Sequence, residues 1–168
     1  RKVAMVAGDC WETGPRSFAL WEKDSSHEHP QKISPSPPQG SWNHTLTWSP
    51  DGKVLASNSD KKLLLTNMEP GAQYRRKIVK GMTRYSYGMC WSPDSTRIAR
   101  YIFEDLEDTK CQMQIWNIDR KKSQATLLHQ LPITAPIVDQ YEVTPDVKWS
   151  PDGNLISLVY NYSTVDPG

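Results

Sequence analysis

The sequence predicts an all-β fold made of repeated four-stranded antiparallel sheets, and three observations support this prediction. A Trp-Ser-Pro-Asp motif occurs three times, starting at residues 48, 91 and 149, and an apolar segment follows each copy. The 168 residues include 13 Pro and 9 Gly, which favour turns, and 7 Trp and 7 Tyr against only 2 Phe. Hydrophobic residues make up only 37% of the chain, so we expect a thin core formed by many short strands rather than by long helices.

The spacing of the motif predicts the kind of sheet. The tryptophans at positions 48, 91 and 149 are 43 and 58 residues apart. A repeat of about 40–45 residues is typical of the four-stranded blades of a β-propeller. The longer second interval is then expected to contain insertions.

The motif also predicts the first two strands of each blade. Leu46, Met89 and Val147 each stand two positions before the Trp, which places both apolar side chains on one face of a strand. In Ser-Pro-Asp-Gly, the Pro ring fixes the φ angle that the second turn position needs, and Gly allows a positive φ at the fourth. The motif therefore predicts a hairpin turn with a bulge. The chain then returns in a second strand, such as residues 53–58. Ser95 replaces Gly in the middle copy, where we expect a left-handed backbone to cost about 1 kcal/mol.

Two further strands complete each blade. Residues 21, 66 and 116 each precede an apolar residue by 12 positions, at 33, 78 and 128. Third strands are therefore predicted at 17–21, 62–67 and 112–118, and outermost fourth strands at 30–34, 75–79 and 125–129. Polar segments between the third and fourth strands predict turns.

The phase of the repeat predicts how strands are distributed along the chain. Because Val3-Ala4 aligns with residues 55–56 and 98–99, we expect three, four, four and two strands of successive blades. The corresponding segments are 1–41 with a Pro-rich connection, 42–80, 81–131, and 132–168, which opens with an insertion loop. A closed propeller has at least about four blades, since fewer leave sheet edges open. About three blades' worth of strands predicts part of a larger propeller of about six to eight blades, completed by further blades or by another chain.

The pattern resembles the TolB-type, WD40-like (PD40) propeller repeat. In that repeat, Trp-Ser-Pro-Asp-Gly-Lys is followed by an apolar strand, Ser-Asp, a third strand and basic residues before the next blade. Residues 59–68 and 75–78 fit this template closely, and the resemblance is firmest over 42–129 and 145–160. It implies blade architecture rather than one function, because similar propellers include periplasmic interaction proteins and the propeller halves of prolyl-oligopeptidase-like serine peptidases. The ordinary WD40 signature is absent, because no third strand contains Trp-Asp.

Composition and charge exclude several function classes. Lys and Arg total 20 and Asp and Glu total 19, so the formal charge is +1 and no overall field attracts nucleic acid or an anionic membrane. Mean hydropathy is −0.66, and no apolar run approaches the ~20 residues of a membrane helix. Cys10, Cys90 and Cys111 form no Cys-x-x-Cys pair, so no thiolate zinc site is expected, although one disulfide is possible. We expect no cofactor, and nothing in the chain indicates a compartment.

Two motifs resemble catalytic or metal-binding elements. Tyr85-Ser86-Tyr87-Gly88 matches half of a serine nucleophile elbow, but Arg84 stands where the first Gly should be, and the elbow needs a strand that feeds a helix. His27-Glu28-His29 could offer two imidazoles, but no third ligand is nearby in the sequence. A loop serine and a solvated turn explain these motifs better, so we expect no catalytic residue and no metal site.

Three charged or proline-rich segments also have simple structural explanations. The acidic run at 104–108 lacks the spacing and Gly of a calcium loop, so an exposed loop is expected. The basic residues 75–77 beside Tyr74 fit an outer strand better than a nucleic-acid contact. The proline-rich segment 30–40 fits a stiff connection between blades better than a ligand of proline-reading domains.

The loops that precede the first strand of each blade are expected to gather on one face, around the propeller axis. Trp42 and Tyr85 share a register six residues before their motif Trp, and Val143 is the third equivalent. Large aromatic side chains and Arg on converging loops are good anchors for a protein or peptide. The candidate binding residues are Trp42, His44, Arg84, Tyr85, Tyr87 and Tyr141. Packing between neighbouring blades is the alternative role for these aromatics, and the three motif tryptophans are expected to be structural.

These observations favour a non-enzymatic propeller scaffold that mediates protein or peptide interaction through one loop face. The alternative is the regulatory, substrate-gating propeller of a prolyl-oligopeptidase-like serine peptidase whose catalytic domain lies outside this chain. A small-molecule or sugar site in the axial funnel is a third possibility, because blade sequences do not encode the funnel.

Overall fold

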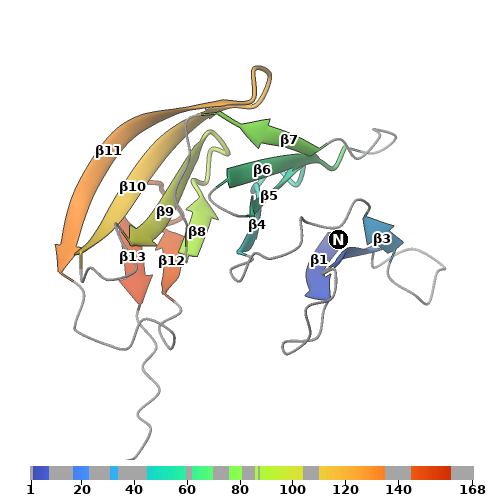
Figure 1. Cartoon of the computed structure of the whole chain (residues 1–168), viewed down its shortest axis with the longest axis horizontal. Helices are drawn as coiled ribbons and strands as arrows, with labels where there is room; N and C mark the ends of the chain where they lie inside the picture. The colour runs from blue at the N-terminus through green and yellow to red at the C-terminus, as the bar shows by residue number, and fades with distance from the viewer. Residues whose placement is uncertain are drawn as a thin grey trace, which may run out of the picture.

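The computed structural model describes the strand backbone of residues 2–7, 17–22 and 31–33, together with residues 45–59, 62–69, 76–80, 86, 88–103, 110–134 and 145–159. This described part is all strand, with thirteen strands in four antiparallel sheets (Figure 1). In chain order, the four sheets contain three, four, four and two strands, as the repeat predicts. The all-β, four-stranded-blade prediction is therefore confirmed.

We number the sheets as blades 1 to 4 in chain order. Blade 1 has the order β1 (Lys2–Ala7), β2 (Ser17–Glu22) and β3 (Gln31–Ile33). Blade 2 consists of β4 (Leu46–Trp48), β5 (Val54–Ser59), β6 (Lys62–Asn67) and β7 (Arg76–Val79). Blade 3 consists of β8 (Gly88–Trp91), β9 (Arg97–Phe103), β10 (Lys110–Asp119) and β11 (Gln124–Thr134). Blade 4 is described over β12 (Asp146–Trp149) and β13 (Ile156–Val159).

The second and third strands pair in the register that the repeat predicts. The aligned residues of the three blades occupy equivalent pairs, namely Val3 with Trp21, Leu55 with Thr66 and Ile98 with Trp116. Side chains of paired residues in an antiparallel ladder lie on the same face of the sheet. In blades 2 and 3 the alignment of the repeat therefore also indicates which side chains face the neighbouring blade.

The fourth strands occur where they were predicted, but their equal spacing in the sequence does not give equal registers. Ile33 pairs with Phe18 and Ile78 pairs with Leu64, whereas Leu128 falls at an irregularity in the ladder between β10 and β11. A bulge inserts one extra residue on one strand and shifts every later pair. The 12-residue spacing therefore marks strands of the same kind rather than structurally equivalent positions.

All three Trp-Ser-Pro-Asp motifs form the predicted hairpin turn with a positive φ at its fourth position. In the first copy the Gly52 N–H donates to the Ser49 carbonyl at 2.8 Å, and the Ser49 N–H donates to the Val54 carbonyl at 2.9 Å. The same two bonds recur in the other copies. The φ values are 70° at Gly52, 61° at Ser95 and 75° at Gly153, which confirms the left-handed backbone expected at Ser95.

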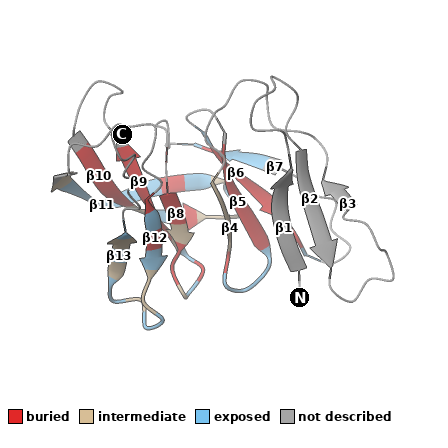
Figure 2. Ribbon diagram, turned by 90° about the horizontal axis from the view of Figure 1, so that it is seen from below, coloured by how far each residue is buried: buried red, intermediate tan, exposed pale blue. Residues whose placement is uncertain are grey.

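The first strands of blades 2, 3 and 4 lie side by side at the inside of the assembly, as in a propeller (Figures 1 and 2). The indole N–H of Trp91 crosses from blade 3 to the Thr47 carbonyl of blade 2, at 3.3 Å. The core lies between blades rather than within one layer. Between blades 2 and 3 it comprises Val54, Ala56, Leu63, Leu65, Val79, Met89, Trp91, Ile98, Trp116, Ile118 and Ala125. Between blades 3 and 4 its buried members are Ala99, Tyr101, Cys111, Met113 and Val147.

Candidate functional site

The connections that enter blades 2, 3 and 4 end next to one another, at residues we call the loop roots: Thr45, Ser86, Gly88 and Pro145. Asn58 of β5 joins the first two of these roots. Its backbone N–H donates to the Thr45 carbonyl at 3.1 Å, and its side-chain amide donates to the Ser86 carbonyl at 3.0 Å. Asn58 is only 2% exposed, so the two bonds satisfy its buried backbone and side-chain N–H groups.

Gly88 joins the roots of blades 3 and 4 by close packing. A Cβ atom at this position would lie 2.5 Å from the Pro145 carbonyl oxygen and 3.0 Å from Cγ2 of Val147. Only a residue without a side chain lets the two inner strands approach this closely. The Ser86 hydroxyl donates to the Gly88 carbonyl at 3.0 Å, which fixes the chain just before β8.

All six candidate binding residues lie outside the described residues. The loop roots nevertheless lie close to them in the sequence, because Thr45 follows His44, Ser86 separates Tyr85 from Tyr87, and Pro145 comes shortly after Tyr141. The described residues next to the candidates therefore lie at neighbouring points of the assembly. His27-Glu28-His29, the acidic run at 104–108 and Cys10 also lie outside the described residues.

The opposite end of the blades carries the Trp-Ser-Pro-Asp turns, and blades 2 and 3 are joined there by what we call the turn clasp: Asp51, Trp91, Ser95 and Arg120. The guanidinium of Arg120 contacts the Asp51 carboxylate at 2.7 Å and also donates to the Ser95 carbonyl. It lies 4.9 Å from the centroid of the Trp91 ring, within cation–π range. The backbone N–H of Asp51 donates to the Ser95 hydroxyl at 3.1 Å. The polar groups of the turn clasp are thus bonded to one another and hold blades 2 and 3 together.

The three motif aspartates have lowered pKa values because each carboxylate accepts hydrogen bonds inside its own turn. The hydroxyl of Ser92 is the main cause at Asp94, whose pKa falls to about 2. The hydroxyl of Ser150 lowers the pKa of Asp152 in the same way. Burial alone would raise the pKa of Asp51, but hydrogen bonds from Ser49 and Arg120 outweigh it and lower the value. These groups are therefore charged at neutral pH and held by their turns.

A buried polar cluster in blade 3 was not foreseen from the sequence. The guanidinium of Arg100, which is 2% exposed, donates to Oε1 of Gln114 at 2.9 and 3.0 Å. The indole N–H of Trp116 donates to the same oxygen at 3.0 Å, and the Trp116 ring lies 5.2 Å from the Arg100 guanidinium carbon. The available signal was the alternation of Gln112, Gln114 and Trp116 on one face of β10. Gln114 stands where the other blades have the apolar residues Leu64 and Ala19.

The described side chains that could act as nucleophiles, the serine of the elbow-like motif and two cysteines, occupy structural positions. Ser86 is 1% exposed and its hydroxyl is bonded to a backbone carbonyl, so it does not occupy an exposed elbow. Burial raises the pKa of the Cys90 thiol to about 12, which keeps it protonated at neutral pH, and burial also raises the pKa of the Cys111 thiol. No group of three His, Cys, Asp or Glu side chains that could hold a metal ion occurs among the residues described. Over the same part of the chain, no helix is long and apolar enough to cross a membrane.

No family model matches the sequence, and no curated protein matches it. Among solved structures, a "putative 6-phosphogluconolactonase" from Bacteroides uniformis superposes with a TM-score of 0.59 and 13% identity, over 91% of this chain and 43% of its own. A protein from Lactobacillus plantarum superposes with a TM-score of 0.57 and 15% identity, over 88% of this chain and 45% of its own. The β-propeller domain of Cps50 (Swd1) from Myceliophteria thermophila gives a TM-score of 0.47 at 15% identity, over 94% of this chain and 52% of its own.

At 13% and 15% identity, the first two likenesses show the fold alone. The chain spans less than half the length of either structure, 43% and 45%. Together with the order of strands in each sheet and the contacts between inner strands, they identify the chain as a β-propeller domain of four-stranded antiparallel blades.

Proposed function

We propose that this chain is a non-enzymatic scaffold of TolB-type propeller repeats that binds a protein or peptide through its loop face. The anchors are the candidate residues of the connections that enter blades 2, 3 and 4: Trp42, His44, Arg84, Tyr85, Tyr87 and Tyr141. Aromatic and Arg side chains supply much of the energy of typical protein interfaces, because they bury a large area and keep a polar tip.

The observation that carries this proposal is the tethering of the loop roots. Asn58 bonds to Thr45 and to Ser86, and Gly88 packs against Pro145, so the three connections end at adjacent points of the assembly. Loops that extend from a rigid, shared base are the usual carriers of binding residues in repeat folds.

The other end of the blades offers less to a partner. Its three turns are closed by internal hydrogen bonds, and in the turn clasp the groups of Asp51, Ser95 and Arg120 are already bonded to one another. A partner at that end would have to replace these contacts. The formal charge of +1 also gives no reason to expect nucleic acid as the main partner.

A peptide selection against the immobilised chain tests the proposal. A selected peptide is labelled with fluorescein, and its affinity is measured by anisotropy. We expect the Trp42→Ala/Tyr85→Ala variant to bind it at least about tenfold more weakly, as for typical aromatic anchors. The control variant Lys53→Ala, changed at the turn end, should bind as the wild type does.

Two results would contradict the proposal. One is a Trp42→Ala/Tyr85→Ala variant that unfolds in urea like the wild type and binds with unchanged affinity. The other is labelling of the chain by a fluorophosphonate probe for activated serines that disappears in Ser86→Ala, since it would make the domain an enzyme.

A further inference from the structure

The seam between the outer parts of blades 2 and 3 carries three exposed lysines, which we call the basic ridge: Lys77, Lys121 and Lys122. It is distinct from the loop face and does not depend on the function proposed for that face. Lys77 comes from β7, the outermost strand of blade 2, and Lys121 and Lys122 come from the turn between β10 and β11 of blade 3. Residues far apart in the sequence therefore meet at this seam.

Backbone contacts bring the two halves of the basic ridge together. The Lys80 N–H donates to the Ser123 carbonyl at 3.2 Å, and the Ala125 N–H donates to the Lys80 carbonyl at 3.1 Å. Lys80 forms an isolated parallel bridge with Gln124. The end of blade 2 is thus fixed directly beside the turn that contains Lys121 and Lys122.

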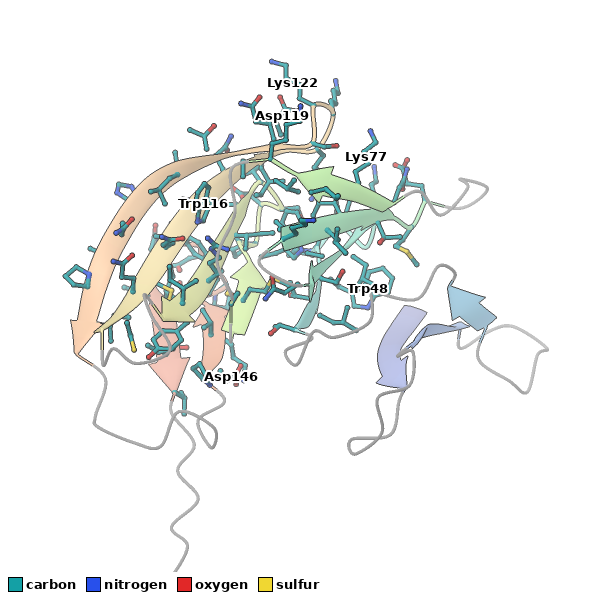
Figure 3. All side chains as sticks on the ribbon, in the orientation of Figure 1. Trp48, Lys77, Trp116, Asp119, Lys122 and Asp146 are labelled. Carbon is teal, nitrogen blue, oxygen red and sulfur yellow. The ribbon has the colours of Figure 1, made fainter. Side chains whose placement is uncertain are left out.

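Lys77 lies on the face of β7 that is directed toward blade 3. Lys77 pairs with Leu65 and Val79 pairs with Leu63, and the last three residues belong to the core between blades 2 and 3. Because paired and alternate residues share a face, Lys77 lies on the side of β7 that faces blade 3. In Figure 3, Lys77 and Lys122 project from the same edge of the molecule.

Nearby carboxylates neutralise the positive charge of the basic ridge only in part. Lys122 contacts the carboxylate of Asp119 at 3.8 Å, and its side chain is still 76% exposed. The nearby carboxylate of Asp51 is engaged by Arg120. Among the described residues, one carboxylate beside three lysines leaves a local excess of positive charge, on a chain whose formal charge is only +1.

We propose that the basic ridge binds an acidic peptide segment of a partner protein. A short row of ammonium groups on two elements complements a row of carboxylates on an extended peptide, and such complementarity sets partner choice and association rate. Nucleic acid fits less well, because single strands are bound by aromatic platforms beside the charges and the described part of this seam exposes no aromatic ring.

Anisotropy with a fluorescein-labelled (Glu-Gly)6 peptide tests the proposal, with (Gln-Gly)6 as the neutral probe. The wild-type chain should bind the acidic probe at low salt, and raising the salt to about 0.5 M should release it, because exposed charges are screened. The Lys77→Gln/Lys122→Gln variant should bind about fivefold more weakly, as expected for two exposed ion pairs. The control Lys53→Gln/Lys62→Gln removes the same charge elsewhere on blade 2 and should change the affinity less than about twofold.

Three results would overturn the proposal. The first is no binding of (Glu-Gly)6 by the wild type at low salt, and the second is equal weakening in the ridge and control variants, which would indicate net charge alone. The third is a poly-dT oligonucleotide that binds more tightly than the acidic peptide and loses affinity in the ridge variant. All substituted lysines are exposed, and urea unfolding of each variant checks that the fold is retained.

Discussion

Ser95 stands at the turn position that is Gly52 in blade 2 and Gly153 in blade 4, and it takes up a backbone conformation that suits glycine. Its φ of 61° is close to the 70° and 75° of the two glycines. A left-handed backbone costs a non-glycine residue roughly 1–2 kcal/mol. The hydroxyl offsets part of this cost, since it accepts the backbone N–H of Asp51 at 3.1 Å across the seam between blades. A strained residue is thus retained at a point where it links two blades.

Two substitutions separate the strain from the hydrogen bond. Ser95→Ala keeps the strain and loses the acceptor, so we expect the free energy of unfolding to fall by about 1 kcal/mol. Ser95→Gly loses the same bond but relieves the strain, so its stability should lie within about 0.5 kcal/mol of the wild type. Urea unfolding at neutral pH measures both. A Ser95→Gly variant that gains the full strain energy would show that the hydroxyl contributes nothing.

The hairpin turn is the element in which the sequence repeat and the local chemistry agree best. In each copy the motif Ser hydroxyl donates to the motif Asp carboxylate, at 2.6, 2.5 and 2.5 Å. The same carboxylate accepts the backbone N–H two residues on. Ser and Asp are therefore needed together, because the charged form of Asp holds both ends of the turn.

This element should make stability depend on pH in the acid range. The pKa of Asp94 is lowered from 3.8 to about 2 in the folded chain, mainly by the Ser92 hydroxyl. The stabilisation is therefore present above about pH 4 and is lost as the pH falls through about 2. Asp94→Asn cannot titrate, so its free energy of unfolding should fall less steeply than that of the wild type between pH 4 and 2. Urea unfolding at several pH values measures the slopes, and equal slopes would rule out this role.

At the level of strands, the sequence predicted best what local chemistry determines. Trp-Ser-Pro-Asp specifies a turn by itself, so the second and third strands follow in the expected register, with Leu55 opposite Thr66 and Ile98 opposite Trp116. The fourth strands follow turns without such a motif. Their lengths vary, and a bulge at Leu128 shifts the ladder. Nothing local in the sequence signals that bulge.

Contacts between blades were the least predictable part of the molecule. Arg120 is an ordinary turn residue in the sequence, yet it reaches Asp51, 69 positions away, and caps the Trp91 ring. Lys80 joins the turn of the next blade through its backbone, which no side-chain pattern reveals. The same holds for the candidate site. The sequence indicated the candidate loop residues, whereas the hydrogen bonds by which Asn58 joins two loop roots are seen only in the structure.

The packing of the inner strands of blades 3 and 4 should be sensitive to any added side-chain volume, and Gly88 tests it. In Gly88→Ala the new Cβ would lie 2.5 Å from the Pro145 carbonyl oxygen, so blades 3 and 4 must move apart. We expect a loss of about 2 kcal/mol in the free energy of unfolding, as for other overpacked sites.

Gly153→Ala is the matched control for this prediction. Its φ of 75° makes alanine unfavourable, but the nearest atom to a Cβ there is 3.7 Å away, so only the backbone strain of about 1 kcal/mol applies. Urea unfolding of both variants measures the difference. If Gly88→Ala lowers the free energy of unfolding no more than Gly153→Ala does, the inner strands can accommodate a Cβ atom at position 88. Close packing at Gly88 would then not be what holds the roots of blades 3 and 4 together.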